Sequence, residues 1–101
     1  MMNKIMQLPE PYRKNVRMAV EILKEVGCDD IFLFGSLAEN NIREGSDIDI
    51  AVRGCPARKF FYVLGKLLRK LDYPVDLVDL DEENDAFSRF LIEEGDLVQI
   101  G

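Results

Sequence analysis

The fold is decided by the stretch IFLFGS at residues 31–36, followed after ten further residues by DIDIAV at residues 47–52. The first run is apolar up to Gly35 and predicts a buried strand. The second alternates acidic and apolar residues before it ends apolar, which predicts another strand. Gly35 and Ser36 therefore stand where a strand ends and a short helix begins. Free N–H groups at a helix start favour a phosphate, and glycine lets the backbone approach a ligand closely.

Asp47 and Asp49 form the second half of this pattern. Residues two apart in a strand face the same way, about 6.7 Å apart along the chain, so both carboxylates lie in front of the sheet. There they repel each other and raise their own pKa values, a penalty that a divalent cation removes. Oxygen-only ligands suit Mg²⁺, which also binds substrate phosphates. Taken alone, each half has a simpler interpretation, a turn capped by Ser36 without a ligand or a strand with its polar face in solvent.

Hydrophobic periodicity and turn residues place the remaining elements. Expected in chain order are a helix over residues 9–26, the strand 31–34, a short helix over 37–41, the strand 47–52, a helix over 56–71, a strand over 75–80, a helix over 85–94 and a short last strand over 97–100, after a loose N-terminal lead-in over 1–8. This order predicts an α/β (α+β) fold, a small mixed sheet of three to four strands with helices packed on it, in a single domain over 1–101. The short connection between the first two strands leaves parallel and antiparallel pairing both open.

Composition narrows the function. The net charge of −6 comes from 19 acidic and 13 basic residues, which disfavours direct nucleic-acid binding by this chain alone. The same charge fits a protein that binds metal cations or a basic partner. The absence of histidine excludes serine–histidine hydrolysis and typical zinc chemistry. Any catalysis must therefore depend on carboxylates, hydroxyls or a bound metal.

Cys28 and Cys55 are the two cysteines, and they form no C-x-x-C pair. With no visible signal peptide, we expect two reduced thiols in a cytoplasmic protein. No apolar run approaches the roughly 20 residues needed to span a membrane.

At this point the sequence resembles a known family. Gly35-Ser36, ten residues and Asp47-x-Asp49 are similar to the signature of the polymerase-beta-type nucleotidyltransferase superfamily. The short chain resembles its minimal (MNT) branch, whose members are often the antitoxins of HEPN–MNT toxin–antitoxin pairs. The resemblance implies a third carboxylate on a later strand, and Asp76 takes that place. Asp79 points to the opposite face of the same strand, and we interpret it as a strand-end acid.

The resemblance also implies a mechanism. Asp47, Asp49 and Asp76 would hold two Mg²⁺ ions, and Gly35 and Ser36 would hold the outer phosphates of ATP or another NTP. The expected reaction moves a nucleoside monophosphate, AMP from ATP, to a hydroxyl. A tyrosine of a HEPN-like toxin is the acceptor that the resemblance suggests.

The segment that follows the Gly-Ser pair differs from the family's pattern at three positions. Leu37, Glu39 and Asn40 stand where many members carry Arg, Arg and Gly, so two positive charges near the phosphates are missing. Arg43 and Arg53 are the candidates to compensate. The alternative function is a catalytically weak or inactive module that neutralises a basic partner by contact. A vestigial site in a domain of a larger assembly is a third interpretation.

The sequence FFY at residues 60–62 lies in a predicted helix. Neighbours on a helix sit about 100° apart, so three adjacent aromatic residues cannot all face one core. At least one should be exposed or lie in an interface, either with a partner or between two copies in a homodimer.

Overall fold

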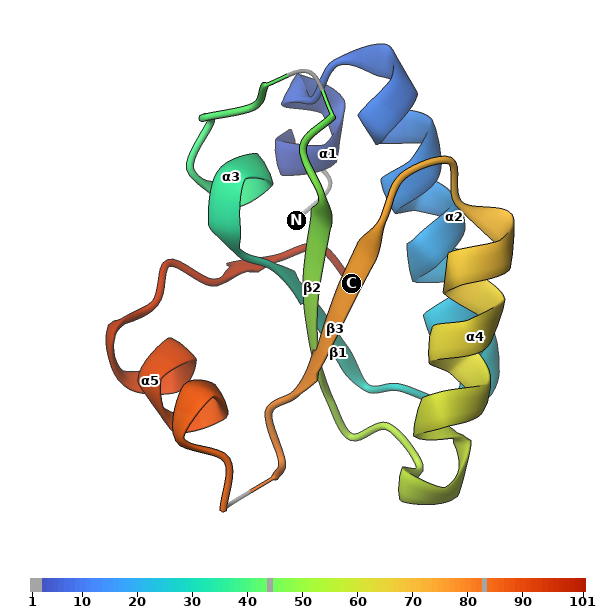
Figure 1. Ribbon diagram of the computed structural model, residues 1–101, viewed down its shortest axis with the longest axis vertical. Coiled ribbons are helices and arrows are strands. Elements are labelled where there is room, and N and C mark those ends of the chain that lie inside the picture. The colour runs from blue at the N-terminus through green and yellow to red at the C-terminus, as the bar shows by residue number, and fades with distance from the viewer. Residues whose placement is uncertain (1–2, 44, 83) are drawn as a thin grey trace.

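The fold is a small mixed sheet with helices on both faces (Figure 1). The computed structural model describes residues 3–43, 45–82 and 84–101. Over these residues the elements are α1 (Asn3–Gln7), α2 (Glu10–Val26), β1 (Asp30–Leu33), α3 (Gly35–Ala38), β2 (Ile48–Arg53), the 3₁₀ helix η1 (Ala57–Lys59), α4 (Phe60–Lys70), β3 (Val75–Asp79), α5 (Ala86–Glu94) and β4 (Val98–Gln99). The predicted α+β class and the mixed sheet are confirmed.

The sheet has the order β3-β2-β1-β4. β1 pairs antiparallel with β2 and with β4, whereas β2 and β3 are parallel. The pairing of β1 and β2, left open by the sequence, is antiparallel because their short connection holds only the four-residue α3. The longer connection through α4 allows the parallel crossover from β2 to β3.

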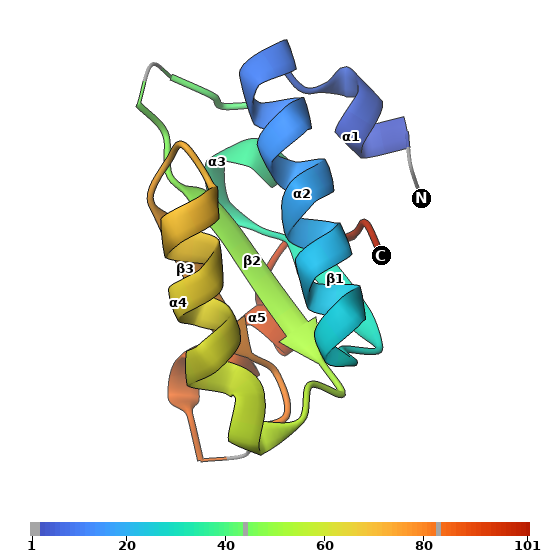
Figure 2. The same ribbon diagram turned by 90° about the vertical axis from the view of Figure 1, so that its right-hand side faces the viewer.

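The main core lies on one face of the sheet. Ile48, Ile50 and Val52 point to this face from β2 and are fully buried. Figure 2 shows α2 and α4 side by side across it. Both helices carry the apolar stripe that their sequences predict, because residues three and four apart share one face.

The opposite face carries a second, smaller core. Phe34, Ala51, Leu80 and Leu91 form it, and α5 supplies Leu91. Because side chains alternate along a strand, Asp49 lies on this same face of β2, two residues before Ala51. The second face is therefore apolar at the end covered by α5 and acidic at the other end.

The expectation of a loose lead-in over residues 1–8 is wrong for the part of it that the structure describes. Residues 3–7 form α1, and Ile5 and Leu8 are buried against the main core. Their burial against α2 and the sheet explains why a segment too short for an independent helix is ordered here.

Tyr12 on α2 holds the loop that leads into β2. Its hydroxyl donates to the backbone oxygen of Ser46 over 3.0 Å, and its ring stacks on Tyr73 with centroids 4.3 Å apart. Ser46 directly precedes Asp47 in the chain. The first turn of α2 thus fixes the start of the acidic strand.

Asn15, one turn further along α2, holds the loop that leads into β3. Its amide donates to Pro11 O (2.7 Å) and to Asp72 Oδ2 (3.2 Å), and its Oδ1 accepts from the N–H of Asp72 (2.7 Å). The side chain is only 1% exposed. This one residue therefore ties α2 to the segment that carries Asp76.

Replacing Asn15 by Ala should lower the free energy of unfolding by about 1–3 kcal/mol, because buried backbone groups lose their partners. Urea denaturation measures the change. Lys14→Ala, an exposed substitution on the same helix, is the control and should stay within about 0.5 kcal/mol of the parent. Equal effects of the two substitutions would contradict the role given to Asn15.

The two cysteines form a disulfide, so the expectation of two reduced thiols is wrong. Cys28 and Cys55 each lie two residues beyond the paired residues Asp30 and Arg53. The antiparallel register of β1 and β2 therefore brings the two cysteines opposite each other. The sequence hides this pairing because the partners are 27 residues apart.

Reduction of this disulfide should destabilise the chain. Closing a loop of 27 residues stabilises the folded state by about 3.5 kcal/mol in the chain-entropy description. We expect thermal and urea unfolding with a thiol reductant to show most of that loss. A Cys28→Ala, Cys55→Ala double variant should be destabilised alike and should not respond to the reductant; a reductant-sensitive double variant would refute the assignment.

Candidate active site

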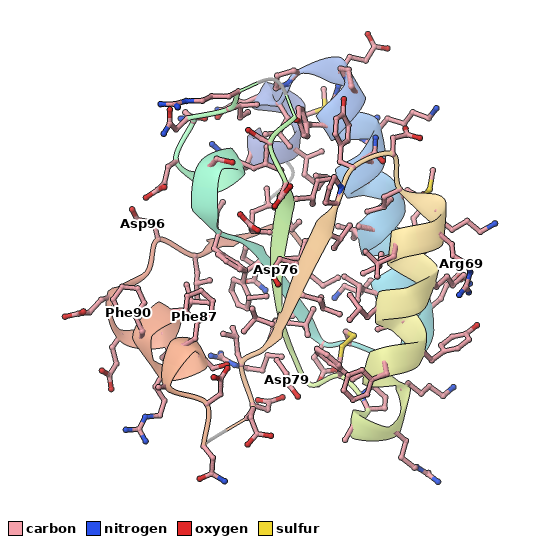
Figure 3. All side chains as sticks on the ribbon, viewed as in Figure 1. Arg69, Asp76, Asp79, Phe87, Phe90 and Asp96 are labelled. Atoms are coloured by element: carbon pink, nitrogen blue, oxygen red, sulfur yellow. A yellow bond between two sulfur atoms is a disulfide. The ribbon has the colours of Figure 1, made fainter. Side chains whose placement is uncertain are left out.

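The structure brings Asp49 and Asp76 together on adjacent strands. The two residues are direct partners in the parallel register of β2 and β3, so their side chains leave the sheet on the same side. Asp47 lies just before β2, two residues from Asp49. Figure 3 shows Asp76 near the middle of the sheet and Asp79 further along β3. Asp79 pairs with Val52 and belongs to the other face, as its spacing from Asp76 predicts.

Burial and like charges both oppose ionisation of Asp49. Partial burial, followed by the charges of Asp76 and Asp47, raises the pKa of Asp49 to about 6. All three causes act in the same direction, and no neighbouring cation is among them. The negative charges of Asp76 and Asp47 thus both act on Asp49, which is an electrostatic setting that a divalent cation relieves.

The donor chemistry fits Mg²⁺ as part of a shared ligand set. Carboxylate oxygens are the ligands that Mg²⁺ prefers, and this ion commonly combines one or two carboxylates with waters and substrate phosphates. Within residues 3–43, 45–82 and 84–101, no three carboxylates or cysteines are gathered closely enough to hold an ion by themselves. Asp47, Asp49 and Asp76 therefore fit an ion that arrives together with a nucleotide.

Gly35 lies directly beside Asp49, in a conformation and a space that favour glycine. Its φ of +68° is in the left-handed region that favours glycine. A Cβ at this position would also collide with Oδ2 of Asp49. The N–H of Phe34 donates to the backbone oxygen of Asp49 over 3.1 Å and fixes this contact. The turn after β1 and the acids of β2 thus form one continuous site.

Ser36 is not the cap of α3. Phe34 occupies the N-cap position and has no polar side chain to offer, so the interpretation of the turn as one capped by Ser36 is wrong. Ser36 is the second residue of α3 and is partly buried. This leaves its hydroxyl available for a ligand.

The residues that depart from the family have separate places in the structure. Leu37 is fully buried in the main core, while Glu39 is exposed at the end of α3. Arg53 lies 5.9 Å from the ring centroid of Phe32 and is four residues beyond Asp49, about 13 Å along the strand. Arg53 therefore does not compensate for the missing charges. Arg43 is exposed in the loop before β2.

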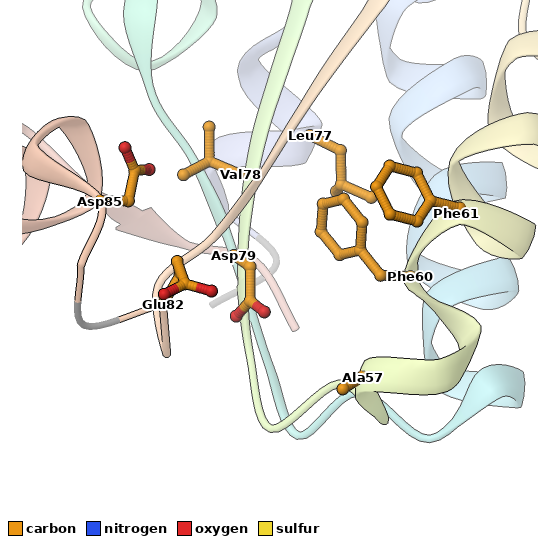
Figure 4. A pocket seen from close by; sticks show the side chains of 8 residues that line it. All are labelled: Ala57, Phe60, Phe61, Leu77, Val78, Asp79, Glu82 and Asp85. Atoms are coloured by element: carbon orange, nitrogen blue, oxygen red, sulfur yellow. The ribbon is translucent and has the colours of Figure 1, made fainter.

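Two hollows lie near the sheet, one beside the turn after β1 and one at the edge formed by β3. One, of about 350 Å³, has Gly35 and Glu39 at one end and Phe87 and Phe90 of α5 at the other. The second, of about 380 Å³, lies between α4 and the end of β3 (Figure 4). Gly35 lines the first hollow and not the second, so the first is the one that adjoins the candidate site, although none of the three candidate site acids lines either hollow.

Phe87 and Phe90 lie within the helix predicted over residues 85–94, but that prediction does not indicate that they are neighbours of Gly35. In the structure 45% of Phe87 and 51% of Phe90 is exposed. Their spacing of three residues was the available signal, because it puts both rings on one side of a helix. Which side faces the turn after β1 depends on tertiary packing.

Comparison with known proteins identifies the class. The chain belongs to the polymerase beta, nucleotidyltransferase family, whose pattern matches residues 18–99. This range includes the Gly35-Ser36 turn and all three aspartates. Among curated proteins no match was found.

Solved structures narrow the resemblance to the antitoxin-like MNT branch. A toxin–antitoxin crystal structure with AMP-PNP is 27% identical with a TM-score of 0.62, over 83% of this chain and 69% of that chain. A crystal structure of the MntA–HepT toxin–antitoxin is 27% identical with a TM-score of 0.59, over 84% of this chain and 69% of that chain. A crystal structure of a mutant of this toxin–antitoxin is 27% identical with a TM-score of 0.65, over 94% of this chain and 73% of that chain. The expected resemblance is confirmed.

In the described part of the chain, every helix is too short or too polar to span a membrane. The exposure predicted within residues 60–62 is confirmed, because Phe61 is 81% and Tyr62 57% exposed.

Asp49→Asn should stabilise the protein at pH 8. Because the pKa of Asp49 is raised to about 6 from 3.8, the folded state binds more protons than the unfolded state between these values. The free energy of unfolding therefore falls as the pH rises through this window. Asparagine removes the repulsion, so the melting temperature should rise at pH 8, with the gain shrinking toward pH 4. Solvent screening of a partly exposed group keeps the gain to about 1 kcal/mol or less.

Asp79→Asn is the matched control for this substitution. It removes one charge from the neighbouring strand on the opposite face, so it should leave the melting temperature at pH 8 nearly unchanged. A loss of stability in Asp49→Asn at pH 8 would contradict the electrostatic description of the site.

Proposed function

We propose that this protein is a Mg²⁺-dependent nucleotidyltransferase that moves AMP from ATP to a hydroxyl of a partner protein. The observation that carries the proposal is the facing pair of Asp49 and Asp76 beside Gly35. Membership of the nucleotidyltransferase family supports the reaction class. The toxin–antitoxin structure with AMP-PNP supports an adenine nucleotide as donor.

The chain's own residues divide the reaction between them. Backbone N–H groups of the turn at Gly35, with the hydroxyl of Ser36, hold the outer phosphates of ATP. Asp47, Asp49 and Asp76 would hold two Mg²⁺ ions, which would supply charge neutralisation and a lowered pKa for the acceptor hydroxyl. Asp76, at the open edge strand of the sheet, accepts the proton of that hydroxyl. The hydroxyl oxygen bonds to the α-phosphorus while the bond to the β-phosphate breaks and pyrophosphate leaves.

The proposed partner is a HEPN-like toxin, and the proposed place of action is the cytoplasm. Similarity to MntA–HepT structures supports a toxin partner, and the net charge of −6 suits a basic one. In the cytoplasm, disulfides are rare because thiols are kept reduced. The assays below should therefore be run on both the oxidised and the reduced protein.

Transfer should be visible with labelled nucleotide. Incubation with Mg²⁺ and the product of the neighbouring reading frame should attach label from [α-³²P]ATP but none from [γ-³²P]ATP. Asp47→Asn and Asp76→Asn should each lower the rate by about 100-fold or more, because removal of a catalytic carboxylate has effects of that order. Asp79→Asn, on the opposite face, should retain the rate. Labelling that depends on Asp79 and survives loss of Asp76 would exclude the proposed site.

The second candidate function is neutralisation of a basic partner by contact alone. The observation that favours it is the pair Leu37 and Glu39, which leaves the phosphate site with little positive charge. Growth rescue in cells expressing the partner tests it. Full rescue by an Asp47→Ala, Asp49→Ala double variant would select this function over catalysis.

A further inference from the structure

The hollow beside Gly35 has no role in the chemistry described above. It is about 350 Å³ in volume, and its walls come from the turn after β1 and from α5. Phe34 and Phe87 meet edge to face with centroids 5.9 Å apart, and the rings of Phe87 and Phe90 are nearly parallel, 6.5 Å apart. Figure 3 shows Phe87 between Phe90 and the sheet. The result is an aromatic wall at the edge of the candidate active site.

We propose that this hollow binds the base of the donor nucleotide, and that it prefers a purine carrying an exocyclic amino group. This inference rests on the proposed function, because it names the base subsite of the same reaction. The hollow is continuous with the phosphate turn, since Gly35 belongs to both. A nucleotide held by its phosphates at Gly35 therefore has its base within reach of Phe87 and Phe90.

The aromatic rings favour stacking of a flat base. Phe87 and Phe90 are each about half exposed, 45% and 51%, whereas Leu91 next to them is buried. Their free faces are apolar and rigid, and base–aromatic stacking stabilises nucleotide binding through surfaces of this kind. A purine covers more of both rings than a pyrimidine.

The charges around the hollow orient the nucleotide. Glu94 and Asp96, at the end of α5, are exposed at its rim, so the α5 side of the hollow repels phosphates and leaves them to the Gly35 turn and the cations. An ionised carboxylate can accept hydrogen bonds but cannot donate them, so it pairs with N–H donors. The amino group of adenine is such a donor, whereas the oxo group of hypoxanthine is not.

Calorimetry on the full chain tests the subsite with three probes, Mg-ATP, Mg-ITP and Mg-tripolyphosphate. We expect Mg-ATP to bind more tightly than Mg-ITP. Phe87→Leu and Phe90→Ala should each weaken Mg-ATP binding by about tenfold, the order expected for loss of one base–aromatic contact, and leave Mg-tripolyphosphate binding unchanged. Phe61→Ala removes an aromatic ring that is 81% exposed on α4. This control should change the binding of neither Mg-ATP nor Mg-tripolyphosphate.

The outcomes separate this inference from the proposed function. If Mg-tripolyphosphate and Mg-ATP bind and the α5 variants bind Mg-ATP as the parent does, the base subsite is wrong and the phosphate site stands. If neither Mg-tripolyphosphate nor Mg-ATP binds, the base subsite and the proposed function both fail. If the α5 variants instead alter sedimentation or binding of the partner at unchanged affinity for Mg-ATP, the aromatic wall is a protein interface and the subsite is excluded. Melting temperatures near that of the parent establish that the variants fold.

Discussion

The parallel pairing of β2 and β3 is the constraint on which the site depends. It sets Asp49 opposite Asp76 and keeps two carboxylates on one face. Partial burial and the charges of Asp76 and Asp47 together raise the pKa of Asp49 to about 6. A fold that only had to be stable would gain by replacing Asp49 with a neutral residue, so stability alone does not explain this acid.

Two features outside the sheet support that arrangement. The first turns of α2 hold the loops before β2 and β3, through the hydroxyl of Tyr12 and the amide of Asn15. At the other end of β2, the disulfide joins the segments that flank β1 and β2. Asp49 therefore lies on a strand that is fixed at both ends, which limits the movement available to its side chain.

The sequence predicted the elements with a strong period and the acids whose faces follow from that period. Asp76 was separated from Asp79 because residues three apart on a strand face opposite ways, and the register bears this out. The sequence did not predict that residues 3–7 form an ordered helix, because that helix depends on burial of Ile5 and Leu8 against distant elements. The disulfide and the aromatic wall were missed for the same physical reason. Both depend on which segments the antiparallel register and the packing of α5 bring together, and no local pattern contains that information.

β2 serves two layers at once, with Ile48, Ile50 and Val52 in the main core and Asp49 on the opposite face. A slip of one residue would exchange these faces, driving carboxylates into the hydrocarbon interior and isoleucines into water. Deletion or insertion of a single residue within this strand is thereby penalised by both layers together. Length changes in the loop that precedes it meet no such barrier, so divergence among relatives should accumulate there while the spacing inside the strand stays fixed.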